Sequence, residues 1–211
     1  MSLASAGTFV IPSATDILEP STRGSAFASH VGWDSFDDDG AGDMIINDFT
    51  PDIGFGVGAL LTLNGEDHIS GSGNYYSGGG SVSEQVAFDT NGVAGSGFTS
   101  VIAQGITLFG PFGSQLSFSE INGVSPDVIQ LTNAAGKGQF WAKWDLPGNE
   151  SSYQFEISGG SSTSFDKLVV DSSWSSSGFS SDLAIPEPSA ALFVLLGFSV
   201  FCGLTRHRRS K

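Results

Sequence analysis

The residue types that could do chemistry in this chain are carboxylates and aromatic rings. The densest acidic stretch covers 34–52, and its carboxylates Asp37, Asp39 and Asp43 stand close to glycines. Calcium prefers several carboxylate and carbonyl oxygens on a loop that can bend around it. The EF-hand spacing is not matched, because the twelfth position counted from Asp37 is Asp48, where that motif needs a glutamate. Calcium is therefore a candidate cofactor here, and a solvated acidic loop is the alternative interpretation.

Two sets of aromatic residues could bind sugars. Trp141 and Trp144 lie in the segment QFWAKWDL, whose alternation directs the two rings to opposite faces of a strand. An exposed tryptophan beside charged neighbours is a platform on which a sugar ring stacks. Tyr75 and Tyr76 lie in the glycine-rich stretch SGSGNYYSGGG, a loop pattern that often carries binding residues. Packing between sheets for Trp141, and anchoring of the loop for the tyrosines, are the alternatives.

Sequence motifs of known catalytic sites are missing. His30 and His68 are the only histidines of the body, and no HExxH, GxSxG, Walker or GxGxxG pattern occurs. A Ser-His-Asp triad or a carboxylate pair of the glycosidase kind needs no fixed spacing. Nothing in the sequence selects two of the 22 acidic residues for such a pair. We therefore predict a protein that is not an enzyme, with a secreted glycan-active enzyme as the alternative.

Charge divides the chain into two regions. The 211 residues carry a formal net charge of −14, and all 22 acidic residues lie at or before Glu187. Only four bases share that region, which leaves it a net charge of −18, while the other four bases fall in the last six residues. A body this acidic repels phosphate backbones, so we do not expect nucleic acid as a partner.

An uncharged apolar segment over 189–205 precedes this basic cluster and contains the single cysteine, Cys202. A helix of this length measures about 25 Å, at the short end of what spans a bilayer. Pro186 and Pro188 stand before it, where proline stops a helix from extending backwards. The positive-inside rule keeps the basic end in the cytoplasm. We predict a single transmembrane helix with the acidic body outside; a buried core helix is the alternative.

The order of these features, over 186–211, resembles a known sorting signal. A Pro-Glu-Pro motif, an apolar span and an Arg-His-Arg-Arg cluster follow one another, as in the PEP-CTERM signal of exported bacterial proteins. The resemblance implies processing by an exosortase, a membrane enzyme, and delivery to the cell surface or to an extracellular matrix linked to exopolysaccharide. The sorting motif and the cytoplasmic anchor that it implies are Pro186, Glu187, Pro188, Arg206, Arg208 and Arg209.

The N-terminal segment, 1–26, has one feature that is typical of an export signal. Met1 to Gly7 reads MSLASAG, which has neither a basic start nor a long apolar core. Ala4-Ser5-Ala6 has the small-x-small form of a cleavage site. We interpret the segment as the end of a longer leader; a chance run of small residues is the alternative.

The candidate residues must be positioned by strands. Short runs in which apolar and polar residues alternate, bounded by Gly, Ser, Asn or Pro, recur through the body, which shows no helical apolar period over ten or more residues. The 17 Phe and 4 Trp supply apolar area for a core. The predicted strands are Val31–Phe36, Ala59–Leu63, Val82–Asp89, Thr99–Phe109, Gln115–Ile121, Asp127–Thr132, Gln139–Leu146, Ser152–Ser158 and Ser164–Asp171.

These runs predict an all-β fold, a two-sheet jelly-roll-like β-sandwich over 27–174. Short turns join the last three strands, which predicts an antiparallel meander. Gly105 predicts a bulge or a break within its strand. The serine-rich stretch Ser172–Ser181 is typical of a flexible tether, and we place a linker at 175–185, before the sorting signal.

Together these features predict an exported protein of the cell surface or extracellular matrix, whose body has a structural or carbohydrate-binding role. The predicted partners are an exosortase, the membrane through the C-terminal helix, and polysaccharide. Two alternatives remain: a glycan-active enzyme on a jelly-roll scaffold, and a membrane-anchored domain whose tail is not processed.

Overall fold

The computed structural model shows the body of the chain as two antiparallel β-sheets, which confirms the predicted all-β class. The described residues are 17–37, 47–63, 67–70, 72–77, 80–108, 116–132, 138–160 and 163–182. These residues form no helix, and so none that is long and apolar enough to cross a membrane. The predicted transmembrane helix over 189–205 and the sorting motif lie outside them.

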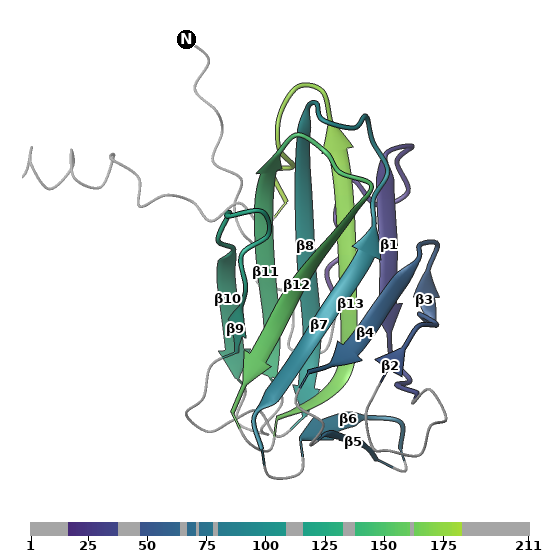
Figure 1. The fold of residues 1–211 in the computed structure, drawn as a ribbon, viewed down its shortest axis with the longest axis vertical. Coiled ribbons are helices and arrows are strands. Elements are labelled where there is room, and N and C mark those ends of the chain that lie inside the picture. Colours follow the sequence, from purple (N-terminus) through teal and green to yellow (C-terminus); the bar gives the residue numbers. More distant parts are fainter. Residues whose placement is uncertain are drawn as a thin grey trace, which may run out of the picture. The chain divides into compact units, whose positions relative to one another are not determined.

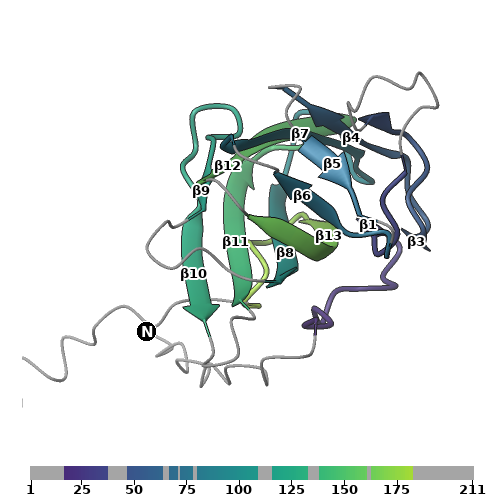
Figure 2. The ribbon, with the colours of Figure 1, turned by 90° about the horizontal axis from the view of Figure 1, so that it is seen from below.

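The two sheets form two layers. Figure 1 shows β12, β7 and β4 of the smaller sheet in front of β8 and β13 of the larger one, and Figure 2 shows both layers from below. Sheet A has the order β10-β11-β8-β13-β1-β3, with β6 paired to β13 and β5 to β6. Its strands are β1 (Ala28–Trp33), β3 (Ile53–Gly54), β5 (Asp67–Ile69), β6 (Tyr75–Ser77), β8 (Phe98–Leu108), β10 (Asp127–Thr132), β11 (Gly138–Pro147) and β13 (Ser164–Ser175).

Sheet B has the order β2-β4-β7-β12-β9. Its strands are β2 (Asn47–Asp48), β4 (Gly58–Thr62), β7 (Val82–Asp89), β9 (Ser117–Phe118) and β12 (Ser152–Gly159). Strands β7 and β12 alternate between buried and more exposed residues along their length, because one face of the sheet meets the core and the other meets solvent.

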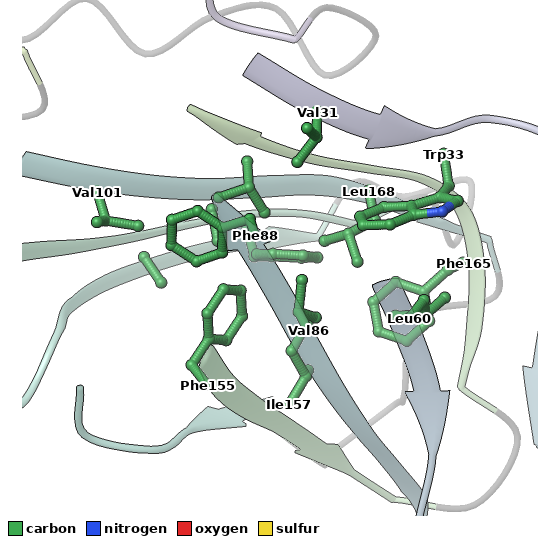
Figure 3. Packing of buried hydrophobic residues seen from close by; sticks show 14 of the residues in the cluster. Val31, Trp33, Leu60, Val86, Phe88, Val101, Phe155, Ile157, Phe165 and Leu168 are labelled. Atoms are coloured by element: carbon green, nitrogen blue, oxygen red, sulfur yellow. The ribbon is translucent and has the colours of Figure 1, made fainter. Parts of the chain in front are cut away.

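One apolar core fills the space between the sheets (Figure 3). Trp144 of β11 and Phe155 of β12 pack across it with ring centroids 4.7 Å apart. Side chains of this size dominate core energetics, because each removes a large apolar area from water. Residues that contribute from both layers include Val31, Trp33, Leu60, Val86, Phe88, Val101, Phe155, Ile157, Phe165 and Leu168.

The bulge or break predicted at Gly105 does not occur there, and the irregularity falls instead on the neighbouring strand, β13. β8 continues through Gly105 without a break, and the register shift falls on β13 between Phe165 and Lys167. Gly105 is required by packing, since a Cβ atom there would come within 2.5 Å of the Phe140 ring. The glycine therefore marks a close approach of a core ring to the sheet.

The predicted meander of the last three strands is wrong. β12 pairs with β7 and β9 in sheet B, whereas β11 and β13 both pair with β8 in sheet A. β12 has no free edge of β11 to pair with, because β10 and β8 take both edges. After β11, Gly148, at φ +84°, donates its N–H to Gly97 O at 2.8 Å and accepts a hydrogen bond from Thr99 Oγ1 at 2.7 Å. These contacts hold the turn beside the start of β8, and from this turn the chain crosses to the other sheet.

Two flanking segments, 17–27 before β1 and 176–182 after β13, bond to the outer face of sheet A; we call them the flanking clasp. The backbone N–H of Leu18 donates to Gln104 Oε1 at 2.8 Å, and Gln104 Nε2 donates to Leu18 O at 2.7 Å. On the other segment, Lys143 Nζ donates to Ser180 O at 2.6 Å. Outward side chains of β8 and β11 therefore hold both halves of the clasp.

The two halves of the clasp also bind each other. The backbone N–H and the hydroxyl of Ser21 both donate to Asp182 Oδ2, at 3.0 and 2.9 Å. The predicted flexible linker over 175–185 is therefore wrong up to Asp182, because β13 extends to Ser175 and the residues that follow bond to the sheet. Residues 183–185 lie outside the described part of the chain.

Candidate binding groove

The outer face of sheet B carries an open groove of about 510 Å³. It crosses the ends of β4, β7 and β12. Ala59 and Ala87 are register partners on neighbouring strands, and Ala87 is also the partner of Gln154. Because partners in an antiparallel ladder project from the same face, the two alanines lie side by side. Two small side chains at adjacent outward positions leave the floor of the groove low.

The apolar side of the groove is formed by Phe49, which is 58% exposed, and by Val57. The backbone around Phe49 is fixed by the buried carboxylate of Asp48, which accepts a hydrogen bond from the N–H of Thr50 at 2.9 Å. Val57 is held beside β7 by a hydrogen bond from Asp89 N to Val57 O at 3.0 Å. An apolar ring is therefore presented to solvent from an ordered position.

The polar side of the groove is built on a tight turn. Asn122 and Gly123 have positive φ angles of 50° and 78°, and Ile121 and Val124 exchange two backbone hydrogen bonds around them. This is the type I′ geometry that an Asn-Gly pair favours. From this turn Asn122 Nδ2 donates to Glu150 Oε1 at 2.6 Å, which fixes the carboxylate of Glu150 at the rim.

The backbone of Glu150 is held as firmly as its side chain. Its N–H donates to the hydroxyl of Tyr153 at 3.0 Å, and its carbonyl accepts a hydrogen bond from the hydroxyl of Thr90. Asp89, the last residue of β7, lines the same groove and is exposed. The rim therefore carries two carboxylates, and none of the described residues that line the groove is a lysine or an arginine.

The groove has the chemistry of a site for a hydroxyl-rich ligand. Phe49 offers an apolar face on which a sugar ring can stack. The amides of Asn122 and Gln154 can donate and accept hydrogen bonds, and the carboxylates of Asp89 and Glu150 accept them. Ligand sites commonly combine apolar surface with a few convergent polar groups in this way.

The outer face of sheet A has a different character, because the carboxylate of Asp171 is buried there and paired. Arg23 donates to both carboxylate oxygens of Asp171, each at 2.7 Å, and His30 Nδ1 lies 3.0 Å from Asp171 Oδ1. Burial raises the pKa of Asp171, but the contacts with His30 and Arg23 outweigh it and hold that pKa below its usual range. This network anchors the flanking clasp, since Arg23 belongs to it.

Trp141 lies on that face and is 2% exposed, so the expectation of an exposed platform is wrong. Its alternation with Trp144 was predicted correctly, because Trp144 is in the core and Trp141 points away from it. The cross-strand partner of Trp141 is Gln104, whose amide binds Leu18 of the clasp. The outer face of sheet A is therefore covered by the flanking clasp, whose residues belong to no strand.

The two tyrosines are separated by burial. Tyr75 is fully buried in β6, where its hydroxyl donates to Glu84, so its expected place on an open loop is wrong. The β6 strand turns Tyr75 into the core and its neighbour Tyr76 away from it. Tyr76 is 39% exposed, with its ring centroid 5.7 Å from that of His68, and a binding role for it stays a prediction.

The predicted calcium ligands lie mostly outside the described residues. Asp37 is described and exposed, and its backbone N–H donates to Asp48 Oδ2 at 3.0 Å, whereas Asp39 and Asp43 fall in the part that is not described. Within the described ranges no group of three or more potential metal ligands occurs. Calcium binding at this stretch stays a prediction.

Sequence patterns did not point to the groove. Its residues come from five separate stretches, and they meet only through the pairing of β4, β7 and β12. Two local signals were nevertheless present: the Asn-Gly pair at 122–123, which is typical of a tight hairpin turn, and the small outward residues Ala59 and Ala87 in otherwise bulky strands.

Comparisons with known proteins add no relative to this description. No protein-family model matches the chain, no curated protein matches it, and no solved structure matches it.

Proposed function

We propose that this chain is an exported protein of the cell surface or extracellular matrix whose jelly-roll-like body binds carbohydrate in the groove of sheet B. The observation that supports binding is the groove itself, in which an exposed ring faces hydrogen-bonding side chains across a low floor. The features that support export are the Pro-Glu-Pro motif, the apolar span and the basic cluster of 186–211. The two proposals rest on separate parts of the chain.

A glycan array with the full-length chain in detergent tests the binding role. Phe49→Ala is the diagnostic variant, because it removes the ring on which a sugar would stack. We expect it to weaken binding about tenfold, at the upper end of what an aromatic contact contributes. Phe55→Ala is the matched control, since Phe55 is 99% exposed and does not line the groove.

Two results would count against the binding role. One is an array on which no glycan is retained by the wild-type chain. The other is equal weakening by Phe49→Ala and Phe55→Ala, which would point to general stickiness of exposed rings and would leave the structural role as the better proposal.

Sorting is tested by fractionation and mass. In the source cell, we expect the mature protein outside the cytoplasm and without Arg206, Arg208 and Arg209, because an exosortase would act near Pro186–Pro188. Substitution of Glu187 by Ala should leave the basic end in place. A mature protein that retains residues 206–211 would favour the membrane-anchored alternative. Intact protein in the cytosol would contradict both the sorting proposal and the membrane-anchored alternative.

An enzymatic role is the second candidate, and one observation favours it. Asp89 and Glu150 line the same groove, and glycosidases work with two carboxylates that flank the scissile bond. Glycans that bind on the array should therefore be incubated with the chain and analysed for shorter products. Product formation that is lost in Glu150→Gln would identify an enzyme, whereas binding without turnover supports a binding protein.

A further inference from the structure

The distribution of charge around the groove restricts the kind of glycan that it can hold. The described part of the chain contains three basic side chains, and each lies within 4 Å of a carboxylate: Arg23 with Asp171, Lys143 with Asp145, and Lys167 with Asp34. All three are bound on the side of sheet A. The groove lies on the outer face of sheet B, where these cations do not reach.

The rim of the groove, in contrast, is anionic and pre-formed. Glu150 is held by Asn122 through its side chain and by Tyr153 through its backbone, and Asp89, the last residue of β7, lines the same groove. Holding a carboxylate in place by hydrogen bonds removes part of the ordering cost that a ligand cation would otherwise have to offset. The region up to Glu187 adds a long-range field of the same sign, since it carries 22 acidic residues and four basic ones.

We infer that the groove selects glycans that carry protonated amino groups over neutral glycans of the same backbone, and that it disfavours glycans that carry uronic acids. This inference rests on the proposed carbohydrate-binding function and adds its ligand class. Phe49 and the amides contribute to any sugar, whereas Asp89 and Glu150 discriminate by charge. A uronate would bring its own carboxylate against this rim, where none of the described lining residues offers a cation to pair with it.

The test compares three hexasaccharides by calorimetry with the full-length chain in detergent and with EDTA present. A glucosamine hexamer and an N-acetylglucosamine hexamer share one backbone and differ in charge, and a galacturonic acid hexamer supplies the opposite charge. The titrations are run at mildly acidic pH, where sugar amines are protonated and exposed carboxylates remain ionised. We expect the glucosamine hexamer to bind about fivefold more tightly than its acetylated counterpart, the size of effect that two exposed ion pairs produce.

Salt and two variants show whether the groove causes the preference. The ratio of the two affinities should fall toward one in about 1 M salt, because the Debye length is then about 3 Å. Glu150→Gln and Asp89→Asn should each lower this ratio. Glu156→Gln is the matched control, since Glu156 is an exposed carboxylate of the same sheet that does not line the groove.

Each outcome bears on one proposal. Equal binding of the two glucosamine-based hexamers, tighter binding of the galacturonic acid hexamer, or an equal effect of Glu156→Gln and Glu150→Gln would overturn the charge preference. In that case, the carbohydrate-binding function would still be supported if the acetylated hexamer binds and Phe49→Ala weakens that binding. Failure of all three hexamers and of the glycan array would overturn the function itself.

Discussion

The outer faces of the two sheets differ in what covers them. On sheet A the flanking clasp lies over β8 and β11, and Trp141, Gln104 and Asp171 are buried beneath it or beside it. On sheet B the outward residues of β7 and β12 meet solvent, and small side chains leave a groove. The outer face of sheet A is therefore buried under the clasp, whereas the outer face of sheet B remains exposed to solvent.

This difference shows that the burial of an outward-facing side chain depends more on which other segments pack over it than on the strand that carries it. Residues with the same alternation, Trp141 on β11 and Gln154 on β12, end as a buried ring and an exposed amide. On the covered face the charge of Asp171 finds its partner within the protein, in Arg23. Substitutions on sheet A should therefore affect stability, and substitutions on sheet B should affect binding.

The largest expected effect separates two aromatic residues. Trp141→Ala should lower the free energy of unfolding by about 4 kcal/mol, because it leaves a cavity where a large ring was buried. Phe49→Ala should change it by less than about 0.5 kcal/mol, as expected for an exposed side chain. Urea unfolding measures both. Similar losses in the two variants would mean that the two faces do not differ as described.

The next effect concerns the charged network under the clasp. Asp171→Asn should cost about 2 kcal/mol, since it leaves Arg23 without its partner in a partly buried site. Asp89→Asn, on the other face, is the matched control and should stay within about 0.5 kcal/mol. If Asp171→Asn is as mild as its control, the network does not hold the clasp to the sheet.

The pH dependence of stability should reveal the same network. Since the pKa of Asp171 is held below its usual range in the folded protein, the unfolded chain binds the proton more tightly. The stabilising contribution is complete above the ordinary aspartate pKa and is lost as the pH falls through the folded value. The difference in unfolding free energy between the wild type and Asp171→Asn should therefore shrink from about pH 6 to about pH 3. A constant difference would contradict this assignment.

The smallest effect concerns the contact between the two halves of the clasp. Ser21→Ala removes one hydrogen bond to Asp182 and should cost about 0.5 kcal/mol. The backbone N–H groups of Leu18 and Ser21 should then exchange with deuterium faster, because local opening of the clasp becomes easier. Ser25→Ala, in the same segment, is the control and should leave these rates unchanged.

Strand positions could be predicted from the sequence because alternation is a local property. β7 and β10 have the predicted bounds, β11 is longer by one residue at each end, and β12 is longer by one residue at its C-terminal end. The assignment of strands to sheets could not be predicted in the same way, since the alternation of β12 is equally compatible with pairing to β11 or to β7. The other partners of β11 decide between them, because β10 and β8 take its two edges, and β8 lies far from β11 in the sequence.

The candidate site was harder to predict than the fold. Trp141 lies on a face where Leu18 and Ser180 bond to Gln104 and Lys143, and both belong to segments without a strand pattern. The groove depends on the register that brings Ala59 beside Ala87, and register is set across strands. The pattern of a single strand therefore identifies aromatic rings that could bind sugars. It does not identify the groove, which several strands form together.

The clasp also has a mechanical consequence. A pulling force that enters along the chain beyond Asp182 reaches the bonds of Asp182 and Ser180 first, and β13 only after these have broken. β13 pairs with β8 along its length and with β1 over Leu168–Ser173, so a pull along the strand shears many ladder bonds at once. A protein tethered by that end would therefore resist extension in two steps. The few bonds of the clasp would break first at low force, and the ladder of β13 would break later at higher force.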